Sequence, residues 1–299
     1  MTDKPSRLAE FTLAPDPEDP RLTRSIEGID HTGASVITPV VQERALTLFL
    51  NAQEIVTMMT IGDHPDLLAV GYLRNQAMLR DDDEITGIDY DEDLEVVVVR
   101  TARATDYEAK LKKKTRTSGC AQGTAFGDMM EAFSAHTLNQ EARLRTSWLY
   151  GLVRKINQCP SLYLKSGAIH GCVLAWQEQP LLYLEDVGRH NAADKIAGYL
   201  FLNKVPTADK IFYTTGRLTS EMVIKCVAME IPILISRSGF TAYGVDLARQ
   251  AGLTLIGRAR GQRFVVLSGQ ARIDFDTEPS TVAHEPSRHR RKGAGEAPQ

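Results

Sequence analysis

The chain has 299 residues, 43% of them hydrophobic and 24% charged, with a formal net charge of -3 at pH 7. This length allows one large or two small domains, and the acidic balance gives no overall attraction for nucleic acid. No apolar run is long enough for a transmembrane helix, and the polar, proline-rich start carries no secretion signal. Four cysteines without C-x-x-C spacing exclude a disulfide scaffold. We therefore expect a cytoplasmic protein that binds neither nucleic acid nor membranes.

The first part of the chain predicts a disordered tail followed by a small α+β subdomain. Residues 1–40 are rich in Pro, Asp and Thr and lack periodicity, which is typical of disorder. The subdomain spans 41–110, where alternating apolar residues indicate strands and Pro65 opens a helix. Its expected elements are a β-hairpin over 46–56, a helix over about 63–80, a solvated acidic loop over 81–84 and a buried strand over 96–99.

Residues 111–125 are predicted to form a basic loop around Cys120. Lysines surround this thiol, and nearby cations lower a cysteine pKa and favour the nucleophilic thiolate. Cys120 is therefore the candidate for covalent chemistry. Cys172 and Cys226 lie in apolar segments and are expected to be small buried side chains.

An α/β domain is expected over residues 126–270, followed by a disordered basic tail over 271–299. Two helices should come first, the second with Leu144, Trp148, Leu152 and Ile156 at core spacing. Strands and helices then alternate, which predicts a mainly parallel sheet. These elements are a hairpin over 169–176 and 181–184, a helix over 191–200, a strand over 211–213, a helix from 219, a strand over 233–236, a helix from 241, and strands over 253–256 and 264–267.

Three strand-to-helix corners follow strands of this sheet, at 186–191, 215–217 and 236–241. Open α/β sheets bind ligands at the carboxyl ends of their strands, where free backbone N–H groups and cationic side chains hold phosphates. The corners therefore favour a phosphate-bearing ligand such as a nucleotide. Ordinary helix caps are the simpler reading of the same residues. Glu221 and Lys225 equally fit a surface pair at i, i+4 spacing, and the basic cluster 258–263 fits a hairpin turn.

A zinc site is one alternative at these corners, because zinc nucleobase deaminases carry H-x-E at one such corner and P-C-x-x-C at the next. Here the first corner reads His190-Asn191-Ala192 and lacks the glutamate, and the second supplies no thiol. Zinc hydrolysis is therefore disfavoured. A metal-dependent hydrolase that uses His170, Cys172 and His190 is an alternative function.

Several motifs, taken in order, resemble the formate dehydrogenase accessory sulfurtransferase family (FdhD) over about residues 42–268. They are Ser118-Gly119-Cys120, Ser166-Gly167-Ala168-Ile169-His170, the run Glu185 to Lys195, Thr215-Gly216-Arg217 with Ser220-Glu221, and Ile231-Pro232-Ile233-Leu234. The resemblance implies a cytoplasmic homodimer with a cytidine-deaminase-like three-layer C-terminal domain that carries no zinc. It also implies a sulfur carrier that takes persulfide sulfur from a cysteine desulfurase. The sulfur would pass to the bis-molybdopterin guanine dinucleotide cofactor, for formate dehydrogenase or a related molybdenum enzyme.

The resemblance assigns Cys120 as the persulfide carrier and the segment 258–263 as part of the cofactor site. The expected cofactor-binding residues are His170, Asp186, Arg189, His190, Asn191, Lys195, Gly216, Arg217, Ser238, Thr241, Arg258, Ala259, Arg260, Gly261, Gln262 and Arg263. Gly123 stands where the family commonly has a second loop cysteine, and Ser238-Gly239-Phe240 replaces its usual Ala-Pro before Thr241. A chaperone that holds the cofactor without sulfur chemistry is thus an alternative.

Overall fold

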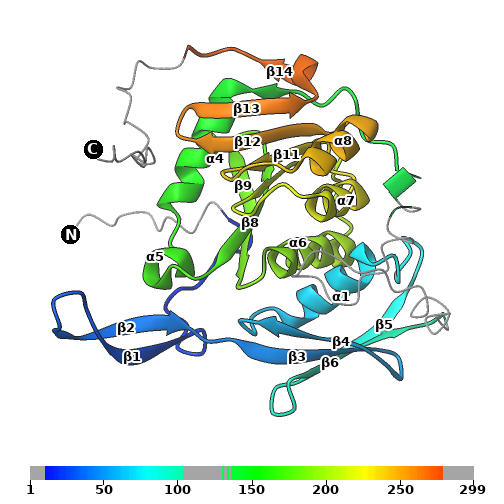
Figure 1. Ribbon diagram of the computed structural model, residues 1–299. Helices are drawn as coiled ribbons and strands as arrows, with labels where there is room; N and C mark the ends of the chain where they lie inside the picture. The colour runs from blue at the N-terminus through cyan, green and yellow to red at the C-terminus, as the bar shows by residue number, and fades with distance from the viewer. Residues whose placement is uncertain (1–10, 104–129, 131–132, 135, 279–299) are drawn as a thin grey trace, which may run out of the picture.

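The computed structural model describes residues 11–103, 130, 133–134 and 136–278 (Figure 1). Its first hairpin, β1 (Thr23–Ile29) and β2 (Ser35–Val41), projects from the body of the molecule. This hairpin corrects our expectation of disorder up to residue 40. Its turn is stabilised by the Asp30 carboxylate, which accepts the Thr32 N–H at 2.8 Å, and by Gly33, which adopts a positive φ of 83°. The amino-acid composition of residues 1–40 does not reveal such a turn, so it did not predict the hairpin.

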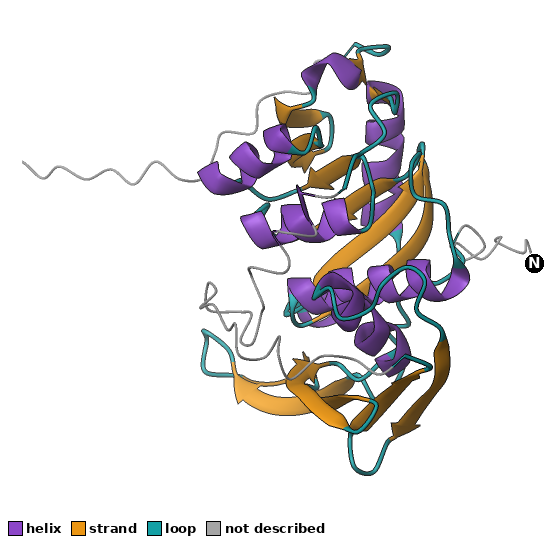
Figure 2. Ribbon diagram, turned by 90° about the vertical axis from the view of Figure 1, so that its right-hand side faces the viewer, coloured by secondary structure: helices purple, strands orange, loops and turns teal. Residues whose placement is uncertain are grey.

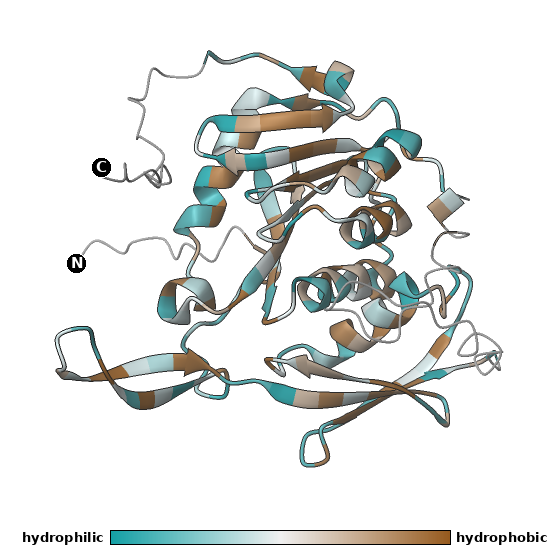
Figure 3. Cartoon of the chain, viewed as in Figure 1, coloured by the Kyte–Doolittle hydropathy of each residue, from teal (hydrophilic) through white to brown (hydrophobic). Residues whose placement is uncertain are grey.

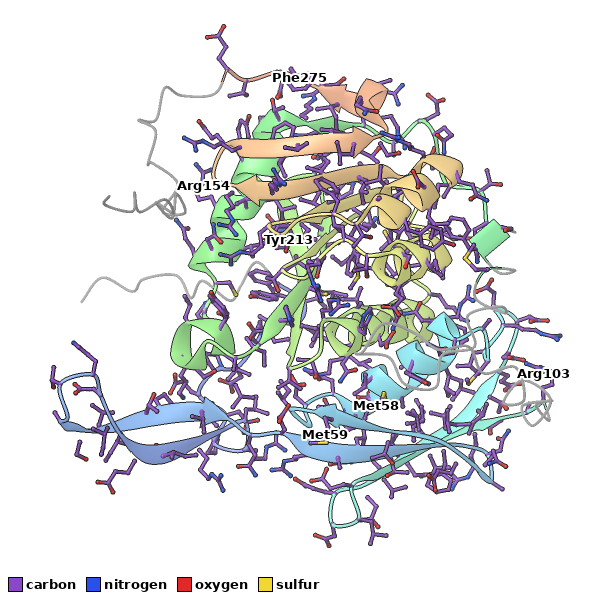
Figure 4. All side chains as sticks on the ribbon, viewed as in Figure 1. Met58, Met59, Arg103, Arg154, Tyr213 and Phe275 are labelled. Atoms are coloured by element: carbon purple, nitrogen blue, oxygen red, sulfur yellow. The ribbon has the colours of Figure 1, made fainter. Side chains whose placement is uncertain are left out.

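The smaller unit consists of a four-stranded sheet covered on one face by a helix, α1 (Pro65–Asn75). The sheet has the order β4-β3-β6-β5. Its strands are β3 (Arg44–Leu50), β4 (Gln53–Thr60), β5 (Ile85–Asp91) and β6 (Val96–Thr101). Side chains alternate between the faces: Met58 is buried against α1, whereas Met59 is 50% exposed on the opposite face (Figure 4).

Two details of this unit differ from the sequence-based expectation. The helix ends at Asn75 rather than near residue 80, because Ala77 adopts a positive φ of 55° that no helix continues. Asp83 in the acidic loop is buried rather than solvated. The Arg103 guanidinium, labelled in Figure 4, donates to both of its carboxylate oxygens at 2.6 Å and lowers the pKa of Asp83.

The larger unit contains a six-stranded sheet of order β13-β12-β11-β10-β8-β9. Its strands are β8 (His170–Trp176), β9 (Gln179–Asp186), β10 (Ile211–Thr214), β11 (Ile233–Ser236), β12 (Thr254–Arg260) and β13 (Arg263–Ser268). Only the β10–β11 and β11–β12 pairs are parallel, and the other three pairs are antiparallel. The expectation of a mainly parallel sheet was therefore wrong. The β8–β9 and β12–β13 hairpins each supply one antiparallel pair, and β8 also runs antiparallel to its neighbour β10.

Helices cover both faces of this sheet, which gives three layers. One face carries α6 (Arg189–Asn203), α7 (Ser220–Ala228) and α8 (Ala242–Gln250), and the other carries α4 (Thr146–Gln158). The short helix α5 (Leu162–Ser166) leads into β8. Hydrophobic residues concentrate on the central strands and on α7 (Figure 3), and Tyr213 on β10 is 1% exposed. Leu144, expected in the same helix as Trp148, instead lies just before α4 in β7 (Leu144–Arg145), which pairs with β14 (Ile273–Asp274).

The two units meet where α1 crosses α6, between the small and large sheets (Figure 2). Glycine on each helix allows the backbones to touch. A Cβ at Gly71 would lie 1.6 Å from the Asp194 carbonyl oxygen, and one at Gly198 would lie 2.0 Å from that of Leu67. The units therefore pack as one body through a crossing that tolerates no larger side chain.

The chain past residue 270 is ordered as far as the description extends, which corrects the expected tail boundary. A 3₁₀ turn, η2 (Gln270–Arg272), and β14 continue the fold. The Asp276 carboxylate then accepts from the Ser147 N–H at 2.9 Å and the Ser147 hydroxyl at 2.6 Å. Residues 279–299 lie outside the described residues. None of the helices in the described part combines the length and apolar character needed to span a bilayer.

Candidate functional site

A pocket of about 370 Å³ lies at the carboxyl ends of the parallel strands, and we call it the corner pocket. All three predicted corners contribute to it, because parallel strands end at the same edge of a sheet. The start of β8 and helix α5 complete the wall. Its lining residues are Tyr163, Gly167, Ala168, Ile169, His170, Val187, Thr215, Arg237, Ser238 and Arg260.

The charges of the corner pocket are positive. The Arg237 guanidinium carbon lies 5.6 Å from the centre of the Tyr163 ring, a cation–π arrangement. The Arg260 Nε donates to the Arg237 carbonyl at 3.3 Å, which brings both cations to the same side. No carboxylate occurs among the described residues that line the pocket. The pocket is therefore suited to an anionic ligand with a planar group that can stack.

His170 adds a neutral donor or acceptor to the same wall. Its Nδ1 lies 3.3 Å from the Thr215 hydroxyl, which in turn accepts the Gly171 N–H at 3.0 Å. Burial lowers the pKa of His170, and repulsion from nearby cations, first among them Arg189, lowers it further. The imidazole is thus held in its neutral form at pH 7.

Arg189 stands at the first turn of α6, beside the corner that contains Gly216. A Cβ at Gly216 would lie 2.8 Å from the Arg189 Cδ, so glycine there makes room for the arginine. Arg189 is 7% exposed, and within the described structure its Nε has no hydrogen-bond partner. A buried guanidinium N–H without an acceptor is costly, so this corner retains donor capacity for a ligand.

Asp186 and Lys195, both predicted to bind cofactor, instead form a buried ion-pair network behind the pocket. The Lys195 ammonium lies 2.6 Å from Asp186 and also contacts Asp63, and it is fully buried. Asp186 further accepts from the Thr60 hydroxyl at 2.5 Å and from the Asn191 amide at 3.0 Å. These side chains join β9 and α6 to the smaller unit, so they stabilise the fold and do not line the pocket.

A second buried set links α6 to α7, which corrects the surface pair considered for Glu221 and Lys225. Lys225 donates to both oxygens of Asp194 at 2.5 and 2.7 Å. His190 Nε2 lies 3.3 Å from Glu221, and burial lowers the pKa of His190. Glu221 and Lys225 on α7 therefore pair with residues of α6, and not with each other.

Three of the predicted binding residues, His170, Ser238 and Arg260, line the corner pocket. Thr241 instead caps α8, since its hydroxyl accepts the Gly244 N–H at 3.2 Å. The segment 258–263 forms the β12–β13 hairpin turn, as its simpler reading proposed. The predicted residues outside the lining are Asp186, Arg189, His190, Asn191, Lys195, Gly216, Arg217, Thr241, Arg258, Ala259, Gly261, Gln262 and Arg263.

The cation Arg237 and the aromatic ring of Tyr163 line the pocket but were not among the predicted binding residues. Arg237 lies inside a predicted corner, so a cation between Ser236 and Ser238 was an available signal. Tyr163 lies on α5, which is only five residues long and has no readable periodicity. Its position depends on how α5 docks, which no local pattern encodes.

The predicted nucleophile Cys120 lies outside the described residues. The other three thiols are buried, as predicted for Cys172 and Cys226. Burial raises the pKa of Cys159 to about 11 and that of Cys172 to about 12, and it raises the pKa of Cys226 as well. These thiols are therefore protonated and unreactive at pH 7. The described residues contain no group of three or more His, Cys, Asp or Glu side chains that could hold a metal ion.

Fold and pocket together define a mixed α/β protein with a basic pocket at the carboxyl ends of its parallel strands. The chain belongs to the FdhD/NarQ family, whose model matches residues 41–274. It is 28% identical to the sulfur carrier protein FdhD of Bacillus pumilus, over 78% of this chain and 90% of that protein. The corresponding figures for the protein of the same name from Wolinella succinogenes are 28%, 79% and 82%.

A crystal structure shows the same architecture. It is that of a Desulfotalea psychrophila protein assigned as a formate dehydrogenase accessory protein. The two chains are 26% identical and superpose with a TM-score of 0.68, covering 84% of this chain and 98% of that one.

Proposed function

We propose that this protein is a sulfur carrier that serves formate dehydrogenase or a related molybdenum enzyme. Cys120 accepts persulfide sulfur from a cysteine desulfurase and passes it to the bis-molybdopterin guanine dinucleotide cofactor. Family membership and the names of the relatives support the carrier role. The single structural observation that supports the cofactor as substrate is the corner pocket, with two guanidiniums, a stacking ring and no lining carboxylate among the described residues.

The corner pocket fits one guanine dinucleotide arm by its chemistry. Arg237 and Arg260 provide charge-assisted hydrogen bonds for the phosphates, and Arg189, which lies outside the lining, adds positive charge near His170. The Tyr163 ring offers a face for the guanine, and its 47% exposure leaves that face accessible. A volume of about 370 Å³ lies at the small end of ligand pockets, so it would hold one nucleotide and leave the pterin outside.

The sulfur step needs a thiolate and, later, a reductant. The Cys120 thiolate attacks the terminal sulfur of the desulfurase persulfide, so one S–S bond forms as another breaks and the desulfurase cysteine leaves as a thiolate. This exchange is redox-neutral. Delivering the carried sulfur as sulfide requires two electrons. Because residue 123 is glycine, no second thiol occupies that loop position, and we assign the electrons to a small-molecule thiol that is oxidised to its disulfide.

Intact-mass analysis after incubation with a cysteine desulfurase and cysteine tests the carrier assignment. Wild type should gain sulfur, and Cys120→Ala should not. Cys159→Ala is the matched control, because the high pKa of that buried thiol predicts unchanged loading. Equal sulfur additions in wild type and Cys120→Ala would remove Cys120 from the mechanism.

A chaperone that holds the cofactor without transferring sulfur is the second candidate, favoured by Gly123 and by a pocket whose described lining has no thiol. Sulfur loading on Cys120, measured beside GDP binding by calorimetry, separates the two candidates. Both predict that Arg260→Gln weakens GDP binding about tenfold, through loss of one charge-assisted hydrogen bond. Only the carrier also predicts sulfur loading on Cys120. GDP binding without any loading would favour the chaperone.

The remaining parts of the proposal are the homodimer, the cytoplasmic location and the cytidine-deaminase-like scaffold. The three-layer arrangement of helices around the mixed sheet supports the scaffold assignment. The metal-dependent hydrolase with His170, Cys172 and His190 has no supporting observation, and stoichiometric zinc in the purified protein would be its test.

A further inference from the structure

A second cavity, of about 420 Å³, lies at the opposite edge of the large sheet, and we call it the Arg272 pocket. It lies where β12 begins and β13 ends, whereas the corner pocket includes Arg260 at the end of β12 (Figure 1). The two cavities share no lining residue. The Arg272 pocket is lined by Gln140, Arg143, Arg249, Gly252, Ser268, Gly269, Gln270, Ala271 and Arg272.

Three of these residues are arginines, and neutral carbonyl groups hold all three. Arg272 is 6% exposed and donates to the Asn139 carbonyl at 3.2 Å and to that of Gly252. The Arg249 Nε donates to a strand carbonyl at 3.1 Å, and Arg143 donates to a loop carbonyl at 3.2 Å. These bonds fix the guanidiniums in place without neutralising them.

Counter-charge for these arginines is nearly lacking within the described residues. The one carboxylate within ion-pair distance is Glu141, 3.9 Å from Arg143 and 88% exposed. A pair so long and so solvated contributes little. Burial lowers the pKa of Arg272, and repulsion from Arg143 lowers it further. A buried guanidinium that lacks an anion keeps most of its desolvation cost.

An unpartnered hydroxyl, that of Thr254, lies behind Gly269 and is not itself part of the cavity lining. Thr254 is fully buried, and its Oγ1 has no hydrogen-bond partner in the described structure. A Cβ at Gly269, which lines the cavity, would lie 2.5 Å from this hydroxyl and 2.9 Å from the Arg272 Nη2. Glycine therefore allows the backbone that lines the cavity to pack closely against the Thr254 hydroxyl and the Arg272 guanidinium. Oxyanions are the ligands that a cluster of guanidiniums recognises.

We propose that the Arg272 pocket binds a phosphate group, either free or at the end of a small phosphomonoester. Three guanidiniums opposed by one distant carboxylate leave an excess of about two positive charges, which matches a phosphate dianion better than a carboxylate. The cavity is larger than phosphate alone requires, so an ester group fits beside it. This site is independent of the sulfur-carrier proposal, because it involves neither Cys120 nor the corner pocket.

Isothermal calorimetry of the full-length protein tests the site, with inorganic phosphate and phenyl phosphate as probes in buffers of equal ionic strength. Wild type should bind phosphate saturably. The double variant Arg143→Gln/Arg249→Gln should bind it at least about tenfold more weakly. Arg272 is left intact because its buried contacts support the fold. Tighter binding of phenyl phosphate than of phosphate would identify the ester as the ligand, and equal binding would identify free phosphate.

Two control variants make the test specific. Arg154→Gln removes an exposed arginine from the outer side of α4 (Figure 4) and should leave phosphate binding unchanged. Arg260→Gln removes a cation of the corner pocket, so any phosphate bound there should be lost in this variant, whereas binding at the Arg272 pocket should be retained. Thermal unfolding of the double variant within a few degrees of wild type confirms that the fold is intact. Unchanged phosphate affinity in the double variant, or its loss in Arg260→Gln instead, would overturn the proposal.

Discussion

Two neighbouring carboxylates on β9, Glu185 and Asp186, have opposite electrostatic surroundings. Successive side chains of a strand point to opposite faces, so Asp186 meets the Lys195 ammonium on the α6 side. Glu185 points to the other side, where its carboxylate accepts the Leu162 N–H at 2.8 Å and the Tyr183 hydroxyl at 3.2 Å. Glu185 is 1% exposed, and burial raises its pKa to about 7. It therefore titrates near neutral pH while it holds the start of α5.

Glu185→Gln should change how the stability of the protein depends on pH. The ordinary pKa of this group is 4.5 and its folded value is about 7, so the native state binds the proton more tightly. Wild type therefore loses stability as the pH rises from 4.5 to about 7, by at most about 3 kcal/mol from this group. The neutral amide removes that loss. Urea denaturation of both proteins at about pH 5 and about pH 8 should show the variant gaining on wild type at the higher pH. A pH-independent difference would contradict the assignment.

Lys195→Met should be strongly destabilising, because it leaves the buried Asp186 carboxylate and the partly buried Asp63 carboxylate without their cation. Breaking one partner of a buried ion pair costs about 3–5 kcal/mol. Lys165→Met is the control, since its pair with Glu18 lies at the surface and is worth less than about 1 kcal/mol. Urea denaturation at pH 7 measures both. Equal losses in the free energy of unfolding would mean that the buried network contributes no more to stability than the surface pair.

At the scale of elements, the crossing of α1 and α6 is the contact most sensitive to a single added methyl group. In Gly71→Ala the new Cβ would meet the Asp194 carbonyl at 1.6 Å, and backbone atoms there cannot move unless the helices separate. We expect a loss of about 3 kcal/mol or more, at the upper end of overpacking costs. Chemical denaturation with urea provides the measurement.

Gly151→Ala on α4 is the matched control for Gly71→Ala. Its Cβ would meet chiefly the carboxylate end of the flexible Glu178 side chain, at 2.2 Å. The better helix propensity of alanine offsets that displacement, so the stability should stay within about 1 kcal/mol of wild type. A loss as large as that of Gly71→Ala would show that the cost reflects glycine replacement in general and not the helix crossing.

Elements also explain which parts of the fold could be predicted from sequence. Strands with strong apolar runs, such as Val96–Val99 and Ile233–Ser236, appear where the pattern predicts them, because burial on a pleated face enforces the pattern. Strand direction could not be read in this way. A hairpin and a parallel crossover both leave alternating apolar residues, so the antiparallel pairs flanking β10–β12 were missed.

The same reasoning applies to the site in the whole molecule. The convergence of the three corners follows from topology, and so could be predicted. Which polar residues face the ligand could not be predicted. The sequence around Asp186 and Lys195 would read the same whether these residues lined a pocket or formed a buried ion pair. The decisive information is the position of the smaller unit, whose Thr60 and Asp63 reach this network across more than a hundred residues of sequence. Tyr163 likewise depends on tertiary docking.

The two units of the molecule should unfold together, because the helix crossing and the buried ion pairs join them. Both tryptophans, Trp148 on α4 and Trp176 on β8, belong to the larger unit, so their fluorescence reports that unit alone. Far-ultraviolet circular dichroism reports both units. The two urea transitions should coincide in wild type and in Gly151→Ala, as two-state unfolding requires. In Gly71→Ala the dichroism should begin to fall at lower urea than the fluorescence, because the smaller unit loses its support first. Separate transitions already in wild type would show that the crossing does not couple the two units.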